Sequence, residues 1–134
     1  MVNSEQHKKP IRILVVDDEE NILELLDTVF TGEGYEVHRA SNGVDALALI
    51  EKIEFDLIVT DHEMPGKTGV EFFREAKKLQ PDMEGRFLFI SGRLGETEFH
   101  QLADETRAGI LFKPFEIKEL REMARLLLSH RNGS

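Results

Sequence analysis

Five short apolar segments alternate along this chain with segments of helical apolar spacing, and this alternation limits the possible folds more than any other feature. The apolar segments are rich in β-branched and aromatic residues, which is typical of strands buried on both faces. Parallel strands need a crossover between them, usually a helix, so the alternation predicts an α/β domain with a parallel sheet and helices on both faces. The expected strands are residues 11–16, 35–40, 56–61, 87–91 and 110–113.

A helix is expected after each of these strands, because apolar residues recur there at helical spacing. The clearest stripes lie within residues 22–30, 46–53 and 117–128, and the weakest lies within residues 95–107. For the third helix we expect an apolar face formed by Val70, Phe73, Ala76 and Leu79.

Length and composition indicate one domain of ordinary globular character. We expect it to occupy residues 10–129, between a flexible tail at 1–9 and a short tail at 130–134. The 17 Lys and Arg against 26 Asp and Glu give a formal net charge of -9, which disfavours nucleic acid and anionic membranes as partners. The chain has no cysteine, no apolar run near the roughly 18 residues of a membrane span and no signal peptide, so we expect a cytoplasmic protein.

Polar residues stand where four of the expected strands end. Asp17 and Asp18 follow the first strand, and Asp61 ends the third. Ser91 ends the fourth strand and Lys113 the fifth. Because the carboxyl ends of parallel strands lie along one edge of a sheet, where ligands usually bind, we expect these residues to line a single site.

The side chains at this edge suit a phosphoryl group and a metal ion. Three carboxylates in one place repel one another, and a divalent cation relieves that repulsion. Oxygen ligands without histidine or cysteine favour Mg²⁺. A lysine and a hydroxyl group can donate hydrogen bonds to phosphoryl oxygens.

Each of these residues also has an ordinary structural interpretation when it is considered alone. Asp61 could cap the following helix, and the acids at 17–20 could complement the positive end of the first helix, worth about 0.3–1 kcal/mol per charge. Ser91 could form a turn, and Lys113 could be a solvated surface lysine. Their joint placement at one edge favours a shared site.

Four motifs at four strand ends carry a resemblance to a known family. They are Val-Val-Asp-Asp-Glu-Glu-Asn at 15–21, Asp-His-Glu-Met-Pro-Gly-Lys-Thr-Gly at 61–69, Ile-Ser-Gly at 90–92 and Lys-Pro-Phe at 113–115. Over residues 10–129 the chain resembles the receiver domain of two-component response regulators, in particular the single-domain chemotaxis type. The resemblance implies a flavodoxin-like (βα)5 fold with strand order 2-1-3-4-5.

The resemblance also implies a phosphorelay function. A sensor histidine kinase or a histidine phosphotransfer protein would pass a phosphoryl group from its phosphohistidine to Asp61, and the change would switch partner binding. Mg²⁺, or Mn²⁺, would be held by Asp17, Asp18, Asp61 and the backbone carbonyl of Glu63. The domain would catalyse its own phosphotransfer and dephosphorylation without being an enzyme for another substrate.

The remaining site residues are implied in the same way. Ser91 would turn toward the phosphoryl group and Lys113 would bind one of its oxygens. The peptide bond before Pro114 is expected to be cis, an isomer that is common only before proline. Glu63 and Arg93 would flank the phosphoryl group, and we hypothesise that these opposite charges pair, shield the site from water and lengthen the life of the phosphorylated state.

One position departs from the family pattern. Most receiver domains carry Tyr or Phe three residues before the lysine, whereas this chain has Ile110, so the aromatic half of the usual switch is missing. Side chains alternate along a strand, so Ile110 and Phe112 share one face and Leu111 takes the other. We hypothesise that Ile110 and Phe112 form an apolar patch beside the fourth and fifth helices, and that an output partner docks there.

Two other functions remain open at this point. A Mg²⁺-dependent phosphohydrolase that uses a covalent aspartyl phosphate, as haloacid-dehalogenase-like enzymes do, would carry its nucleophile on the first strand and usually a cap insertion. A phosphorylation-independent interaction module would be expected to lose the acids, and all three are present. A zinc-protease motif starting at His62 is excluded, because Gly66 stands where the second histidine would be.

Overall fold

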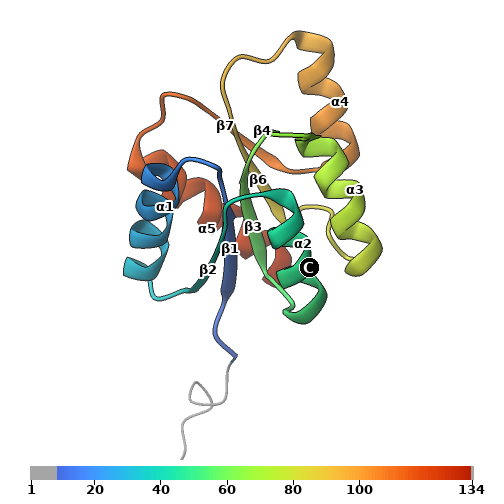
Figure 1. Cartoon of the computed structure of the whole chain (residues 1–134). Coiled ribbons are helices and arrows are strands. Elements are labelled where there is room, and N and C mark those ends of the chain that lie inside the picture. The colour runs from blue at the N-terminus through green and yellow to red at the C-terminus, as the bar shows by residue number, and fades with distance from the viewer. Residues whose placement is uncertain (1–8, 134) are drawn as a thin grey trace, which may run out of the picture.

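A five-stranded parallel sheet forms the centre of the molecule (Figure 1). The structure is a computed structural model that describes residues 9–133. Two further short strands, β4 (Glu63–Met64) and β5 (Lys67–Thr68), pair only with each other, so the five long strands have the order β2-β1-β3-β6-β7. Counted in chain order this is 2-1-3-4-5, which confirms the expected fold. The long strands are β1 (Arg12–Val16), β2 (Glu36–Ala40), β3 (Leu57–Asp61), β6 (Phe87–Ser91) and β7 (Gly109–Phe112).

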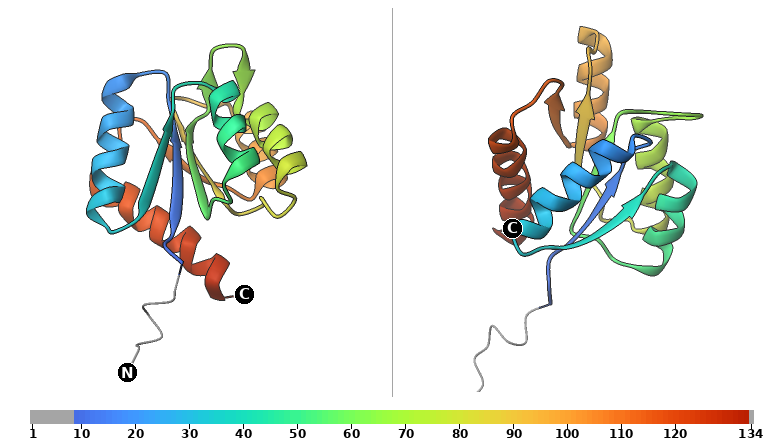
Figure 2. Two further views of the ribbon diagram at one scale, coloured as in Figure 1. Left: turned by 60° about the horizontal axis from the view of Figure 1, so that its bottom comes forward. Right: turned by 60° about the vertical axis from the view of Figure 1, so that its left-hand side comes forward.

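Helices cover both faces of the sheet (Figure 2). One hydrophobic cluster joins the sheet to α1 and α5, and a second joins it to α2, α3 and α4. The helix bounds are α1 (Glu20–Gly32), α2 (Gly43–Lys52), α3 (Gly69–Leu79), α4 (Glu96–Thr106) and α5 (Ile117–Gly133).

The period-two alternation of the strands divides their side chains between the two clusters. Along β6, Phe87 and Phe89 pack with α2, α3 and α4, whereas Leu88 and Ile90 pack with α1 and α5. All four side chains are fully buried. A strand that is apolar on both faces can only lie inside such a sandwich, which explains why the apolar segments were continuous rather than alternating.

Helix α3 buries part of the expected face: Phe73 and Ala76 are buried as predicted, but Val70 is only partly buried. The buried residues are Gly69, Phe72, Phe73 and Ala76, while Leu79 is 42% exposed. Successive steps of three residues fall about 60° short of a full turn, so a row from Val70 to Leu79 drifts about 180° around the helix. The row at i, i+3, i+4 and i+7 stays on one side, and that row is the one that faces the sheet.

Some boundaries also differ from expectation. Strand β7 ends at Phe112 rather than at Lys113, although the Lys113 backbone N–H still donates to the Ser91 carbonyl at 2.7 Å. Helix α5 continues to Gly133, past the expected domain end at residue 129. The expected N-terminal tail lies outside the described residues except for Lys9.

Candidate functional site

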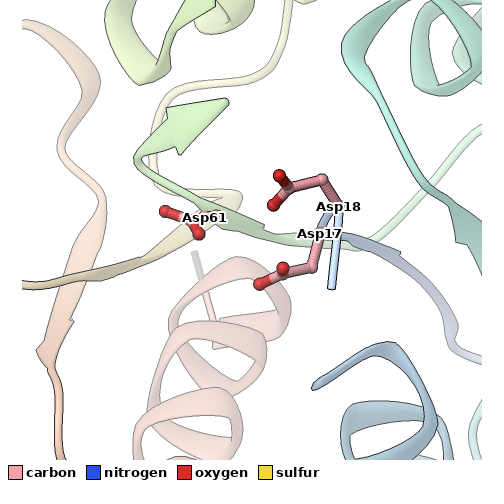
Figure 3. A group of neighbouring side chains, drawn as sticks. All are labelled: Asp17, Asp18 and Asp61. Atoms are coloured by element: carbon pink, nitrogen blue, oxygen red, sulfur yellow. The ribbon is translucent and has the colours of Figure 1, made fainter. Parts of the chain in front are cut away.

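Three carboxylates meet at the carboxyl edge of the sheet (Figure 3). Asp61 is the last residue of β3, and Asp17 and Asp18 follow β1 directly. These two strands are hydrogen-bonded neighbours, with Val16 opposite Thr60, so the residues that follow the pair lie side by side. Each of the three acids offers an oxygen that lies within 4.8 Å of the oxygens of the other two, an arrangement able to hold a metal ion.

Backbone amides and one lysine hold two of these carboxylates in place. The Glu19 N–H donates to Asp17 Oδ1 at 2.9 Å, and the Glu63 N–H donates to Asp61 Oδ1 at 2.9 Å. The Lys113 Nζ lies 3.4 Å from Asp61 Oδ2. Asp61 is therefore oriented on both oxygens, by the start of the next loop and by a cation that follows β7 at the same edge of the sheet.

Asp17 is destabilised as an anion by its surroundings. Burial raises the pKa of its carboxyl from the ordinary 3.8 to about 6, and the charges of Asp61 and Asp18 act in the same direction. The hydrogen bond from the Glu19 N–H and the charge of Lys113 lower the pKa by less. Asp17 Oδ2 is buried and has no hydrogen-bond partner among the described residues. A cation at this oxygen would relieve both penalties.

Ser91 and Lys113 stand together on the other side of Asp61. Ser91 is the last residue of β6, is 1% exposed, and its Oγ is buried without a partner among residues 9–133. Lys113 follows β7, which pairs with β6, so its ammonium group reaches the same edge. The Lys113–Pro114 peptide bond is cis, the isomer that was expected. The five polar residues of the strand ends are thus brought to one edge.

The loop after Asp61 is more ordered than the sequence indicated. It folds into an antiparallel hairpin of β4 (Glu63–Met64) and β5 (Lys67–Thr68), with Gly66 at a φ of +78° in the turn. Thr68 and Glu71 then form a capping box at the start of α3. The hairpin and the cap hold the segment that carries the proposed carbonyl ligand, Glu63.

The expected ion pair between Glu63 and Arg93 is not formed. Both side chains are exposed, and no ion pair joins them in the part of the chain that the structure describes. Two long, exposed side chains lose rotamer entropy when they pair and gain little from Coulomb attraction in water. The net free energy of such a pair is therefore close to zero.

Ile110 and Phe112 divide differently from the single patch that was expected. Ile110 is partly buried against the cluster beneath α4, whereas Leu111 packs into the opposite cluster, as the alternation required. Phe112 is 42% exposed and its ring stacks on that of Phe99 in α4, with centroids 6.0 Å apart. The exposed apolar side chain is therefore Phe112, while Phe99 and Ile110 are both partly buried.

Sequence reasoning missed the packing role of His62, the residue after Asp61. His62 is 4% exposed and meets the Phe89 ring edge to face, with centroids 6.0 Å apart. A Cβ on Gly69 would lie 2.8 Å from both rings, so only glycine fits there. The position of His62 directly after a buried strand could have indicated its burial. Histidine is more often a surface residue, and this favoured the opposite interpretation.

Comparison with known proteins decides which family this site belongs to. The family profile described as "Response regulator receiver domain" matches residues 13–125. The chain belongs to the response regulator receiver domain family. As a receiver domain it is a phosphoacceptor signalling domain of two-component systems, which confirms the resemblance. Among the helices in the described part of the chain, none has the length and apolar character of a membrane span.

Relatives and solved structures agree with this assignment. The chain is 35% identical over 118 residues to Sporulation initiation phosphotransferase F of Bacillus subtilis, covering 87% of this chain and 93% of that protein. It is 33% identical to Sensor kinase CckA of Brucella abortus, covering 87% of this chain and only 12% of the kinase. A CheY-like receiver domain protein from Methanospirillum hungatei superposes with a TM-score of 0.83 at 28% identity, over 93% of this chain and 98% of that one.

Proposed function

We propose that Asp61 takes a phosphoryl group from the phosphohistidine of a sensor histidine kinase or a histidine phosphotransfer protein. The observation that carries the proposal is the position of Asp61 between the two other acids and Lys113. An Asp61 oxygen lies within 4.8 Å of oxygens of Asp17 and Asp18, and Asp61 Oδ2 lies 3.4 Å from Lys113 Nζ. We also propose that this happens in the cytoplasm, where such kinases obtain phosphoryl groups from ATP.

The residues fit a hard divalent cation. Asp17, Asp18, Asp61 and the backbone carbonyl of Glu63 would hold Mg²⁺ or Mn²⁺, and the unpartnered Oδ2 of Asp17 is a free oxygen ligand of the right kind. When bound, the ion neutralises negative charge on the carboxylates and on the phosphoryl oxygens.

In the proposed transfer, a carboxylate oxygen of Asp61 bonds to phosphorus as the P–N bond of phosphohistidine breaks. The imidazole nitrogen of the donor keeps the electron pair of that bond. Lys113 moves its hydrogen bond from Asp61 to a phosphoryl oxygen, and the unpartnered Ser91 Oγ donates to another. In hydrolysis, a water oxygen bonds to phosphorus as the bond between phosphorus and the Asp61 oxygen breaks, which restores the Asp61 carboxylate. Inorganic phosphate leaves, and the proton lost by the water goes to the phosphate or to solvent.

Incubation with Mg²⁺ and acetyl phosphate tests the proposal directly. Intact mass spectrometry should show wild type gaining one phosphoryl group, and Asp61→Asn should gain none, because the amide is not a nucleophile at this site. Asp104→Asn, which removes an exposed acid from α4, is the matched control and should be phosphorylated like wild type. A phosphorylated Asp61→Asn protein, or an unmodified wild type, would refute the assignment.

We further propose that Glu63 and Arg93 each shield the phosphoryl group from water. Glu63→Ala and Arg93→Ala should each speed loss of phosphate by roughly two- to fivefold, the effect of an exposed interaction worth up to about 1 kcal/mol. Because no ion pair joins the two side chains within the described residues, the two factors should multiply in the double variant. Unchanged dephosphorylation in both single variants would eliminate this role.

We propose that the output partner contacts Phe112 on the face made by α4, β7 and α5. Phe112→Ala should weaken binding of that partner by about tenfold or more, as truncation of an aromatic anchor does. Val44→Ala is the matched control, since Val44 is 72% exposed but lies on α2. The measurement is calorimetry with the phosphorylated protein, and equal affinities for wild type and Phe112→Ala would contradict the proposal.

A further inference from the structure

A second concave site lies at the opposite edge of the sheet from Asp61. It has a volume of about 550 Å³, inside the range of roughly 300–1,000 Å³ that is usual for small-molecule sites. Arg86 directly precedes β6, and Arg107 lies just before β7. Asp61 and Ser91 end their strands, so a five-residue strand of about 15 Å separates the two sites.

Among the described residues, Arg107 is the cation of this cavity without an ion pair, although its charge also helps to lower the pKa of the Glu84 carboxyl. Asp82 is paired with Arg86 at 2.9 Å, and Glu84 is paired with Lys77 at 2.5 Å, so both acidic groups of the wall already have a counter-ion. Arg107 forms no ion pair with any residue in the range 9–133. Three cations, Lys77, Arg86 and Arg107, thus act on two acids, Asp82 and Glu84, and the excess positive charge favours an anion there.

The backbone at Arg107 adds an independent observation. Arg107 ends α4 in the left-handed conformation, with φ 54° and ψ 26°, and within the described chain it is the one residue other than glycine with positive φ. Glycine adopts this conformation at helix ends without steric cost, whereas the Cβ of arginine makes it less favourable in energy. Strained residues of this kind gather at ligand sites, where the side chain is needed.

The remaining wall is apolar and accessible. Leu126 and Leu127 of α5 line the cavity, and Leu126 is 56% exposed, although a large aliphatic side chain is normally covered. His130, one turn further along α5, contributes an imidazole that can donate a hydrogen bond. The lining of the cavity thus includes both apolar side chains and a cation.

We infer that this cavity binds a small organic anion with an apolar body, such as an aromatic or branched carboxylate. The carboxylate would pair with Arg107 and the body would cover Leu126 and Leu127. Arginine matches a carboxylate with two parallel N–H donors, which makes it the more selective cation for this group.

Calorimetric titration of the full chain with 2-naphthoate tests the inference, with neutral 2-naphthamide as the comparison ligand. Wild type should bind 2-naphthoate saturably and at least tenfold more tightly than 2-naphthamide. Arg107→Gly should bind 2-naphthoate at least tenfold more weakly while remaining as stable as wild type, because glycine suits the left-handed position. Lys118→Ala removes an exposed cation from α5 outside the cavity and should bind like wild type.

Two results would overturn this assignment. One is the absence of saturable binding by wild type, and the other is equal affinity of wild type and Arg107→Gly for 2-naphthoate. Asp61→Asn should bind 2-naphthoate with the affinity of wild type, because the two sites lie at opposite ends of the strands. Loss of phosphorylation and loss of this binding are therefore separately observable.

Discussion

Asp17→Asn should raise the free energy of unfolding of the metal-free protein at pH 7 by up to about 3 kcal/mol. The pKa of the buried Asp17 carboxyl is about 6 in the folded chain against an ordinary 3.8, and each unit corresponds to about 1.4 kcal/mol. The folded state therefore holds a proton that the unfolded state releases, so wild-type stability falls as pH rises from about 4 to about 6 and then stays level. Asparagine carries no charge at any of these pH values, and its carbonyl can still accept from the Glu19 N–H.

Excess Mg²⁺ should reverse the order of the two proteins. Binding of Mg²⁺ to the folded state alone adds RT ln(1 + [Mg²⁺]/Kd) to the free energy of unfolding, and the variant lacks one of the ligands, so its Kd is larger. Urea unfolding between pH 4 and pH 8, with a chelator and with excess Mg²⁺, measures both effects. Asp104→Asn, on the surface of α4, controls for the loss of one negative charge. The interpretation fails if Asp17→Asn is no more stable than wild type at pH 7 in chelator.

Phe87→Ala should lower the free energy of unfolding by about 3–5 kcal/mol. Phe87 is fully buried and its ring lies between three others, with centroids 5.6 Å from Phe72, 5.3 Å from Phe73 and 5.4 Å from Phe89. Removing the ring loses the free energy gained by transferring it from water to the core. It also leaves a cavity, because the backbone of β6 and helix α3 cannot move together to fill the space. The aromatic contacts add to the loss.

Two variants separate burial from shape in this measurement. Phe112→Ala removes the same side chain from a 42% exposed position and should cost much less than Phe87→Ala in the same urea titration. Phe87→Leu keeps most of the apolar volume, so it should lower the free energy of unfolding by less than about 1.5 kcal/mol. Equal losses for Phe87→Ala and Phe112→Ala would show that the ring cluster does not determine stability.

The arrangement of strands and the identity of the strand-end residues were open to prediction because they depend on local pattern. Continuous apolar segments such as 87–91 are incompatible with a solvated sheet face, so a covered parallel sheet was the remaining solution. Once the sheet is parallel, Asp17, Asp61, Ser91 and Lys113 must share an edge, whatever the details of packing.

The face of α3 and the role of His62 depend on contacts that local pattern does not contain. A row of apolar residues at steps of three and a row at steps of three and four look alike in sequence, and only the sheet decides which of them is covered. The burial of His62 follows from the absence of a Cβ at Gly69 and from the ring of Phe89 across the strand, which are distant in the chain.

By itself, then, the sequence determined the α/β order, the site edge and the chemical type of each residue on it, because alternation and residue identity are local properties. Only the tertiary structure decided the pKa of Asp17, the hairpin after Asp61, the missing pair between Glu63 and Arg93, and the cavity beside Arg107. The pKa, the missing pair and the cavity depend on distances between segments far apart in the chain, and burial and Coulomb energy depend on those distances. The hairpin joins residues only a few positions apart, but its two strands of two residues are too short to show a periodic pattern in the sequence.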